Sequence, residues 1–229
     1  MTNPFKEKLR RDEVVIVVNP DHPSPSLTEF VAALGFDGVF IDCEHGMAGF
    51  ERVQEMCRAA RVVGVQSVVR PESNASHLIT RYLDAGAGGV MVPHIETPEA
   101  ARSVVEAVRY ARPKDHADKV VIAMLESVAA IDRLDEILLV EGVDVFFMGP
   151  NDLSQSMNLP GQIHHSEVKT TIKRAAARIR AAGKIPGTLV VRETAAEYAA
   201  AGCRYLYEHA NNFLMTGARD FKEHLKANS

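Results

Sequence analysis

A short apolar stretch of this chain ends abruptly in ionisable residues. Residues 36–46, FDGVFIDCEHG, have the pattern of a buried strand that stops at Asp42, Glu44 and His45. In parallel α/β folds the C-terminal ends of the strands carry the chemistry. Asp42 is three residues before His45, a spacing that allows the carboxylate to orient the imidazole as a general base. An equally weighted alternative is that His45 is a structural histidine whose hydrogen bonds are made within the turn.

Polar residues also follow three later apolar stretches. Arg70 and Glu126 end two of them, and Gly149, Pro150, Asn151 and Asp152 follow a third. Glu126 and Asp152 come from neighbouring strands, so the two carboxylates can share one hard divalent cation, with water in its other positions. The alternative is structural, with Glu126 beside a helix N-cap at Ser127 and Asp152 capping a turn.

Arg70 has two compatible interpretations. It precedes Pro71 at a strand end, where it can neutralise Glu44 and also bind a substrate carboxylate. We expect four other histidines to be surface or loop residues, because their spacing to acids and thiols is not that of metal ligands; they are His94, His164, His165 and His209.

The elements that must position these residues alternate regularly along the chain. After a short helix over 5–11, the pattern predicts strands at 14–18, 38–42, 66–70, 89–92, 120–126, 143–148, 185–191 and 204–207. It predicts helices at 27–34 (capped by Ser26), 50–63, 75–85, 98–110, 128–139, 166–182, 193–201 and 212–226. Eight such units in 229 residues indicate one α/β domain, a (β/α)8 TIM barrel. An open doubly wound sheet is the alternative, but no GxGxxG opens a helix.

Composition excludes several classes of function. The formal net charge of −4 offers no basic field for nucleic acid or an anionic membrane. The charged N-terminus and the absence of a long apolar run predict a cytoplasmic protein. Cys43, Cys57 and Cys203 match no zinc or redox spacing, and we expect free thiols. The last two strand ends lack the glycines of a phosphate site, which argues against phosphosugars.

Five motifs, taken in order, resemble the HpcH/HpaI aldolase family. They are FDGVFIDCEHG, VVRP (68–71), LDAGAGGVMVPHIETPEAA (83–101), LES (125–127) and VFFMGPNDLSQSM (145–157). The resemblance spans about residues 36–187 and implies a (β/α)8 barrel that acts as a class II, metal-dependent pyruvate aldolase. Such an enzyme cleaves a 4-hydroxy-2-oxo acid to pyruvate and an aldehyde through a pyruvate enolate stabilised by Mg²⁺, Mn²⁺ or Co²⁺.

The resemblance also implies a role for each site residue. Glu126 and Asp152 match the two metal ligands, and Arg70 matches the arginine on the keto oxygen of pyruvate. His45 and Asp42 match the acid/base dyad. The backbone of Gly149, Pro150 and Asn151 matches the segment that holds the pyruvate carboxylate.

Two features depart from the family pattern, and two other functions compete with aldol cleavage. Met124 stands where glutamine is common, and the segment 110–119 is shorter than its usual counterpart, which helps shape the mouth of the site. The alternatives are a related lyase of the citrate lyase/malyl-CoA lyase superfamily and a non-catalytic barrel that binds a keto acid and a metal. The resemblance further implies a homo-oligomer, a hexamer, whose C-terminal helix packs on a neighbouring subunit.

Overall fold

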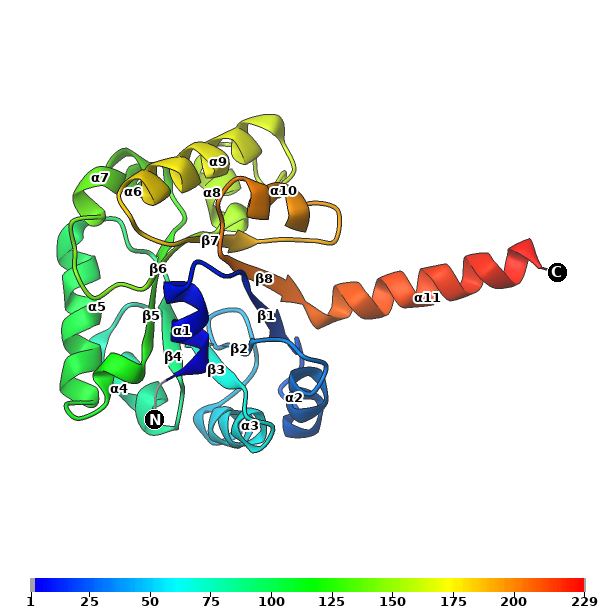
Figure 1. The fold of residues 1–229 in the computed structure, drawn as a ribbon, viewed down its shortest axis with the longest axis horizontal. Coiled ribbons are helices and arrows are strands. Elements are labelled where there is room, and N and C mark those ends of the chain that lie inside the picture. The colour runs from blue at the N-terminus through cyan, green and yellow to red at the C-terminus, as the bar shows by residue number, and fades with distance from the viewer. Residues whose placement is uncertain (1–2, 229) are drawn as a thin grey trace.

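Eight parallel strands close into a barrel in the computed structural model, which describes residues 3–228 (Figure 1). The strands are β1 (Val15–Asn19), β2 (Gly38–Asp42), β3 (Gln66–Arg70), β4 (Gly89–Val92), β5 (Val120–Leu125), β6 (Val145–Met148), β7 (Pro186–Leu189) and β8 (Tyr205–His209). Each strand pairs with the next, and β8 pairs with β1 in the register Val17 to Tyr207. The predicted TIM barrel is therefore confirmed.

Helices separate the strands and surround the barrel (Figure 1). They are α1 (Pro4–Arg10), α2 (Pro25–Ala32), α3 (Phe50–Val62), α4 (Ser76–Asp84), α5 (Pro98–Ala111), α6 (Val128–Asp132), α7 (Leu134–Ile137), α8 (Pro150–Ser156), α9 (Ser166–Ala181), α10 (Ala195–Ala200) and α11 (Ala210–Ala227), with a 3-10 turn, η1, at His116–Asp118. Among these described residues no helix is long and apolar enough to cross a membrane.

Three helical details differ from the sequence prediction. The helix expected over 128–139 is divided into α6 and α7, because Arg133 leaves the helical conformation at φ −92° and ψ 11°. Ser24, rather than Ser26, caps α2, and its side chain accepts the N–H of Leu27. The turn expected around Asp152 is the helix α8, which begins at Pro150, a residue whose fixed φ suits the first helical position.

The barrel interior is filled by side chains that point inward from alternate strand positions. Phe40, Phe147, Tyr205 and Tyr207 pack with edge-to-face geometry, with ring centroids 4.7 to 6.2 Å apart. A second apolar layer lies between the strands and the outer helices. The interior is therefore a packed core that supports the residues above it.

Helix α1 closes the N-terminal end of the barrel. Phe5 joins the interior cluster, and Lys6 pairs with Asp144 at 2.9 Å. The Lys6 ammonium also donates to the carbonyls of Ala117 and Lys119. The short segment 110–119 therefore packs against α1, at the end of the barrel opposite the C-terminal ends of the strands.

A close approach between strands requires glycine at the start of β4, and this requirement gives a test of the packing. A Cβ added to Gly89 would lie 2.5 Å from the Val120 carbonyl oxygen, whereas one added to Gly217 of α11 meets no atom within 4 Å. We expect Gly89→Ala to lower the free energy of unfolding by about 1–3 kcal/mol. Gly217→Ala is the matched control and should not lower it, because alanine favours helix. Urea denaturation at one protein concentration measures both; equal losses would contradict the packing described.

Candidate active site

A buried arginine and two carboxylates form the centre of the site. Asp42 and Arg70 are register partners at the ends of β2 and β3, so strand pairing itself brings them together. The Arg70 Nε and Nη2 donate to the two Asp42 oxygens at 2.9 and 2.6 Å. Its Nη1 lies 3.0 Å from Glu44 Oε2. Arg70 therefore pairs with Glu44, as one interpretation predicted, and also grips Asp42 in bidentate fashion.

The Arg70 guanidinium lowers the pKa of Asp42 by more than burial raises it. Burial raises the pKa of Asp42, but the hydrogen bonds and the charge of Arg70 lower it more, and the net pKa lies below its usual range. Below this pair, the Phe40 ring lies 5.8 Å from the Arg70 guanidinium carbon. Both side chains are thus held ionised at the floor of the barrel mouth.

The turn after β2 is fixed by the same aspartate. Asp42 Oδ1 accepts the backbone N–H groups of Glu44 and His45 at 3.0 and 3.2 Å. Gly46 is required here, because an added Cβ would lie 2.1 Å from the Asp42 carbonyl oxygen. In the described contacts Asp42 holds the backbone of His45, not its imidazole, which is 65% exposed and lies 4.0 Å from Glu44 Oε2. The predicted orientation of the imidazole by Asp42 is therefore not what the side chains adopt.

His94 is an exposed loop histidine, as expected, and it nevertheless contacts the carboxylates of the site. Its backbone N–H donates to Glu126 Oε1 at 2.7 Å. Its imidazole lies 3.2 Å from the same oxygen and 3.0 Å from Glu44 Oε1. A left-handed backbone at His94 (φ 57°) produces this geometry. The loop after β4 thereby connects the carboxylates that follow β2 and β5.

Glu126 has one oxygen engaged and one available. Oε1 contacts His94, while Oε2 is buried and has no hydrogen-bond partner among residues 3–228. A Cβ on Gly149 would lie 3.0 Å from Oε2, so glycine keeps this side open. Burial raises the pKa of Glu126; His94 opposes the shift, and the negative charges of Asp152 and Glu44 add to it. A buried carboxylate beside other carboxylates is an environment that favours a bound cation.

The donor set at Glu126 fits a hard metal ion that keeps open coordination positions. Asp152 lies in the first turn of α8, close enough for its charge to act on Glu126. Ser127 caps α6 as predicted, so the structural role and the site coexist. Within the described part of the chain no group of three or more His, Cys, Asp and Glu side chains is arranged to hold a metal. Two carboxylates with remaining positions for water and substrate are the arrangement that Mg²⁺ commonly uses.

The other predicted substrate-binding residues lie beside the same carboxylate. Gly149 caps α8, Pro150 begins it, and Asn151 follows in its first turn, with the Asn151 carbonyl accepting from Ser154 Oγ at 2.7 Å. Met124, the departure noted in the sequence, is buried, and its Cε lies 3.4 Å from the position of a Cβ on Gly149. The structure therefore places Gly149 next to Glu126, with Met124 packed against the same glycine and Pro150 and Asn151 following it in α8.

The three cysteines take no part in these contacts. All are free, as predicted from their spacing, and all are buried. Cys43 stands directly after β2, and burial raises its pKa to about 12. A thiol in that state is a small apolar residue and a poor nucleophile.

Comparisons with known proteins agree with these features. Residues 21–208 match the family described as HpcH/HpaI aldolase/citrate lyase. The chain is 34% identical to the 2-keto-3-deoxy-L-rhamnonate aldolase of Escherichia coli (strain K12), covering 96% of this chain and 91% of that protein. An HpcH/HpaI aldolase/citrate lyase family protein from Burkholderia cenocepacia J2315 superposes with a TM-score of 0.90 at 29% identity, over 98% and 100% of the two chains. The citrate synthase SbnG superposes with a TM-score of 0.85 at 28% identity, over 98% of each chain.

The Asp42–Arg70 pair predicts how stability changes in acid. Because the pKa of Asp42 is lower in the folded chain, the pair stabilises above the unfolded pKa of about 3.9, and this contribution is lost as pH falls through the folded value. Asp42→Asn leaves Arg70 partly unpaired, and we expect it to lower the free energy of unfolding at pH 7 by about 3 kcal/mol. The difference from the unmodified protein should shrink as the pH falls below about 4. Chemical denaturation with chelator present measures the free energy of unfolding of both proteins. A difference between them that is the same at every pH would contradict the pairing.

Proposed function

This chain belongs to the HpcH/HpaI aldolase/citrate lyase family, and from that premise we propose that it cleaves a 4-hydroxy-2-oxo acid into pyruvate and an aldehyde. It is a carbon–carbon lyase, a pyruvate aldolase close to the 2-keto-3-deoxy-L-rhamnonate aldolases. The proposal is carried by one observation. Arg70 lies among the carboxylates of Asp42 and Glu44, and Glu44 is linked through His94 to Glu126, one oxygen of which is buried and available.

Arg70 stabilises the negative charge that develops on the substrate. Cleavage of a carbon–carbon bond beside a carbonyl group leaves an enolate, so the site must hold negative charge on oxygen. The hydrogen bonds to Asp42 use two of the five N–H groups of Arg70, and Nη1 faces Glu44 as an ion pair. N–H groups not bonded to Asp42 donate to the keto oxygen of the pyruvate half. Because both carboxylates fix the guanidinium before substrate binds, little reorganisation accompanies the reaction.

Glu126 and Asp152 are the proposed ligands of a divalent cation, Mg²⁺, Mn²⁺ or Co²⁺. When bound, the cation supplies positive charge beside the keto acid and so lowers the energy of the enolate. His94 holds Glu126 Oε1, which leaves Oε2 directed to the open side at Gly149. The backbone at Gly149, Pro150 and Asn151 binds the pyruvate carboxylate.

His45 is the proposed acid/base residue. Its exposed imidazole stands at the barrel mouth, where it removes the proton of the substrate 4-hydroxyl in cleavage and returns it to the aldehyde oxygen in synthesis. Asp42 supports this role by holding the His45 backbone and the Arg70 side chain together. The proposed substrate is a 2-keto-3-deoxy sugar acid, like that in the name of the relative from E. coli.

Exchange of the pyruvate methyl protons in heavy water tests the enolate step without the aldehyde. We expect NMR to detect exchange with Mg²⁺, Mn²⁺ or Co²⁺ and to detect none with a chelator. Glu126→Gln removes a proposed ligand charge and should slow exchange by about 100-fold or more. Glu106→Gln, the same change on an exposed residue of α5, is the control and should exchange normally.

An absence of pyruvate proton exchange would favour one of the competing functions over aldol cleavage. A folded protein that shows no exchange with any of these metals would overturn the aldolase assignment. A citrate synthase or acyl-CoA lyase activity, or keto-acid binding without turnover, would then be the better reading, given the likeness to SbnG.

The proposed enzyme is a homo-oligomer, because most of the described residues of helix α11 beyond its base are left exposed by their own chain. It extends away from the barrel (Figure 1), and of its described residues Ala210 alone is buried. Phe213, Leu214, Met215 and Phe221 are 46% to 71% exposed. An amphipathic helix of 18 residues with its apolar side chains exposed is stabilised by packing on another chain.

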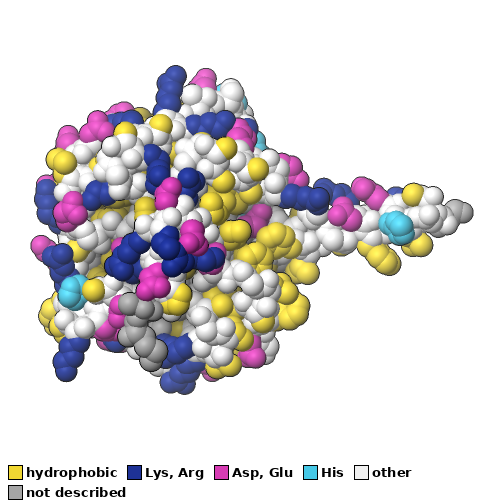
Figure 2. Space-filling model, in the orientation of Figure 1, with side chains coloured by type: hydrophobic (Ala, Val, Ile, Leu, Met, Phe, Trp, Pro, Cys, Tyr) yellow, Lys and Arg dark blue, Asp and Glu magenta, His cyan; other side chains and the backbone are white. Residues whose placement is uncertain are grey.

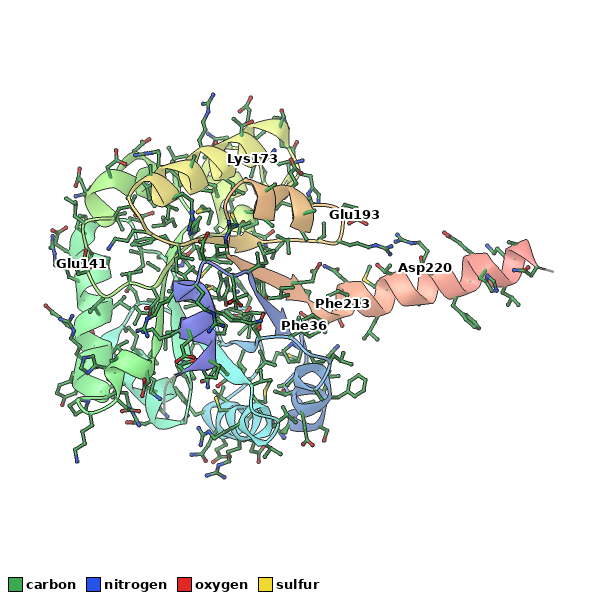
Figure 3. The ribbon with its side chains drawn as sticks, viewed as in Figure 1. Phe36, Glu141, Lys173, Glu193, Phe213 and Asp220 are labelled. Atoms are coloured by element: carbon green, nitrogen blue, oxygen red, sulfur yellow. The ribbon has the colours of Figure 1, made fainter. Side chains whose placement is uncertain are left out.

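A groove on the barrel is the proposed seat for that helix. Ile16 of β1 is 39% exposed, although strands of such barrels are normally covered by helices. A cavity of about 1130 Å³ lies beside it, bounded by β1, β8, the segment after β7 and α11 from Asn212 to Lys226. Apolar side chains gather at the base of the helix, where Phe36 stacks on Phe213 with ring centroids 5.7 Å apart (Figures 2 and 3). The α11 helix of a neighbouring copy fills this groove.

The size of the assembly tests this arrangement. Light scattering should give several copies of the 25.1 kDa chain, six for the expected hexamer. Phe221→Asp places a charge on the apolar side of α11, and we expect it to shift the mass toward the single chain. Tyr110→Asp makes the same exchange of an exposed aromatic side chain for a carboxylate on α5, away from this groove, and should leave the mass unchanged. A monomeric unmodified protein, or an assembly unaffected by Phe221→Asp, would contradict the proposal.

A further inference from the structure

A second histidine–carboxylate pair stands at the barrel mouth, outside the residues assigned above. Asp21 follows β1, and His209 ends β8. Asn19 and His209 are register partners, so closure of the barrel brings the two segments together. We propose that His209, oriented by Asp21, binds a hydroxyl group on the aldehyde-derived half of the substrate and so selects hydroxyaldehydes. This inference rests on the proposed aldolase function.

The pair is rigidly built. Asp21 Oδ1 contacts His209 Nδ1 at 2.5 Å, and Oδ2 accepts the Asn211 N–H at 2.8 Å. The Asp21 N–H donates to Asn19 Oδ1, and Asp21 adopts a left-handed backbone with φ 64°. The Asp21 side chain is 10% exposed. The His209 ring also packs edge to face against Tyr207, with centroids 5.0 Å apart.

The geometry of the pair fixes the chemistry that His209 offers. Because Nδ1 faces Asp21, Nε2 is the ring atom left for a ligand. A substrate hydroxyl both donates and accepts, so it can form a hydrogen bond with Nε2 whether or not that atom carries a proton. Asp21 is therefore a positioning residue, and His209 is the residue that touches the substrate.

The cavity beside the pair connects it with the proposed acid/base residue. It has a volume of about 200 Å³, and its polar lining includes His209, Asp21, Asp42 and His45, while Met56 and Ile41 are apolar. This cavity has room for a group of a few atoms. If the carbonyl carbon of the aldehyde lies beside His45, the carbon bonded to it extends into the cavity toward His209, and so does any hydroxyl on that carbon.

The pair also has a structural role, which must be separated from recognition. It ties the loop after β1 to the start of α11, and His22 reinforces this tie by contacting Asn211 Oδ1 at 3.3 Å. A purely structural tie has no need of a partly exposed imidazole facing a cavity shared with Asp42 and His45. The side chain of His209 is 33% exposed.

Three small aldehydes that differ at one position provide the test. Glycolaldehyde carries a hydroxyl on the carbon next to the aldehyde, and acetaldehyde carries only hydrogen on that carbon. In glyoxylate that carbon is itself the carboxylate carbon. We expect His209→Phe to lower kcat/KM for addition of pyruvate to glycolaldehyde about tenfold, the effect of one lost hydrogen bond. Addition to acetaldehyde and pyruvate proton exchange should change less than twofold. His209→Gln restores an acceptor and should recover part of the loss.

Asn211→Ala is the matched control for the structural role. It removes the side-chain contact with His22 but keeps the backbone N–H that binds Asp21, so it should leave the preference for glycolaldehyde intact. An equal loss on all three aldehydes in His209→Phe would make the pair a structural tie, and a loss confined to glyoxylate would make it an anion site. Either result overturns the inference while pyruvate exchange persists. Absence of exchange in the unmodified protein overturns the proposed function as well.

Discussion

The mouth of this barrel is organised by the ion pairs of Arg70. Strand pairing places Arg70 beside Asp42, and the bidentate contact then fixes the turn that carries Glu44 and His45. Glu44 in turn contacts His94, which holds Glu126. A single buried cation thus neutralises two acids and sets the position of loops from four strands. In such a network the removal of one partner leaves the others charged and buried, which is costly.

The two ends of the barrel have different roles: the N-terminal end contributes stability, and the C-terminal end carries the residues of the site. At the N-terminal end, α1 supplies Phe5 to the interior cluster and Lys6 to Asp144 and to the segment before β5. At the other end, the strands present the polar residues of the site, among them Glu126, whose carboxylate is destabilised by burial and by the negative charges of Asp152 and Glu44. The aromatic interior lies between the two ends. The packed half therefore compensates for the electrostatic cost of the polar half.

The fold was predictable because each strand is a short apolar stretch between helix signals, and periodicity depends on local sequence. Asp42, Arg70 and Glu126 were also predictable as strand-end residues. The position of His94 was not, because it depends on a left-handed backbone and on two carboxylates from other loops. The Asp21–His209 contact joins residues at opposite ends of the chain, and it exists because the sheet closes. Helix α8 was missed because Pro, Asn and Asp favour turns as well as helix starts.

The buried thiols have a consequence for an enzyme that handles aldehydes. Thiolates add readily to such electrophiles, and Cys43 stands directly after the strand that carries Asp42. Burial holds the pKa of Cys43 and of Cys203 at about 12. At neutral pH the reactive form is on the order of one molecule in 10⁵. The fold thereby protects the catalyst from covalent self-inactivation by the carbonyl compound that it releases, and from oxidative loss of the same sulfur atoms.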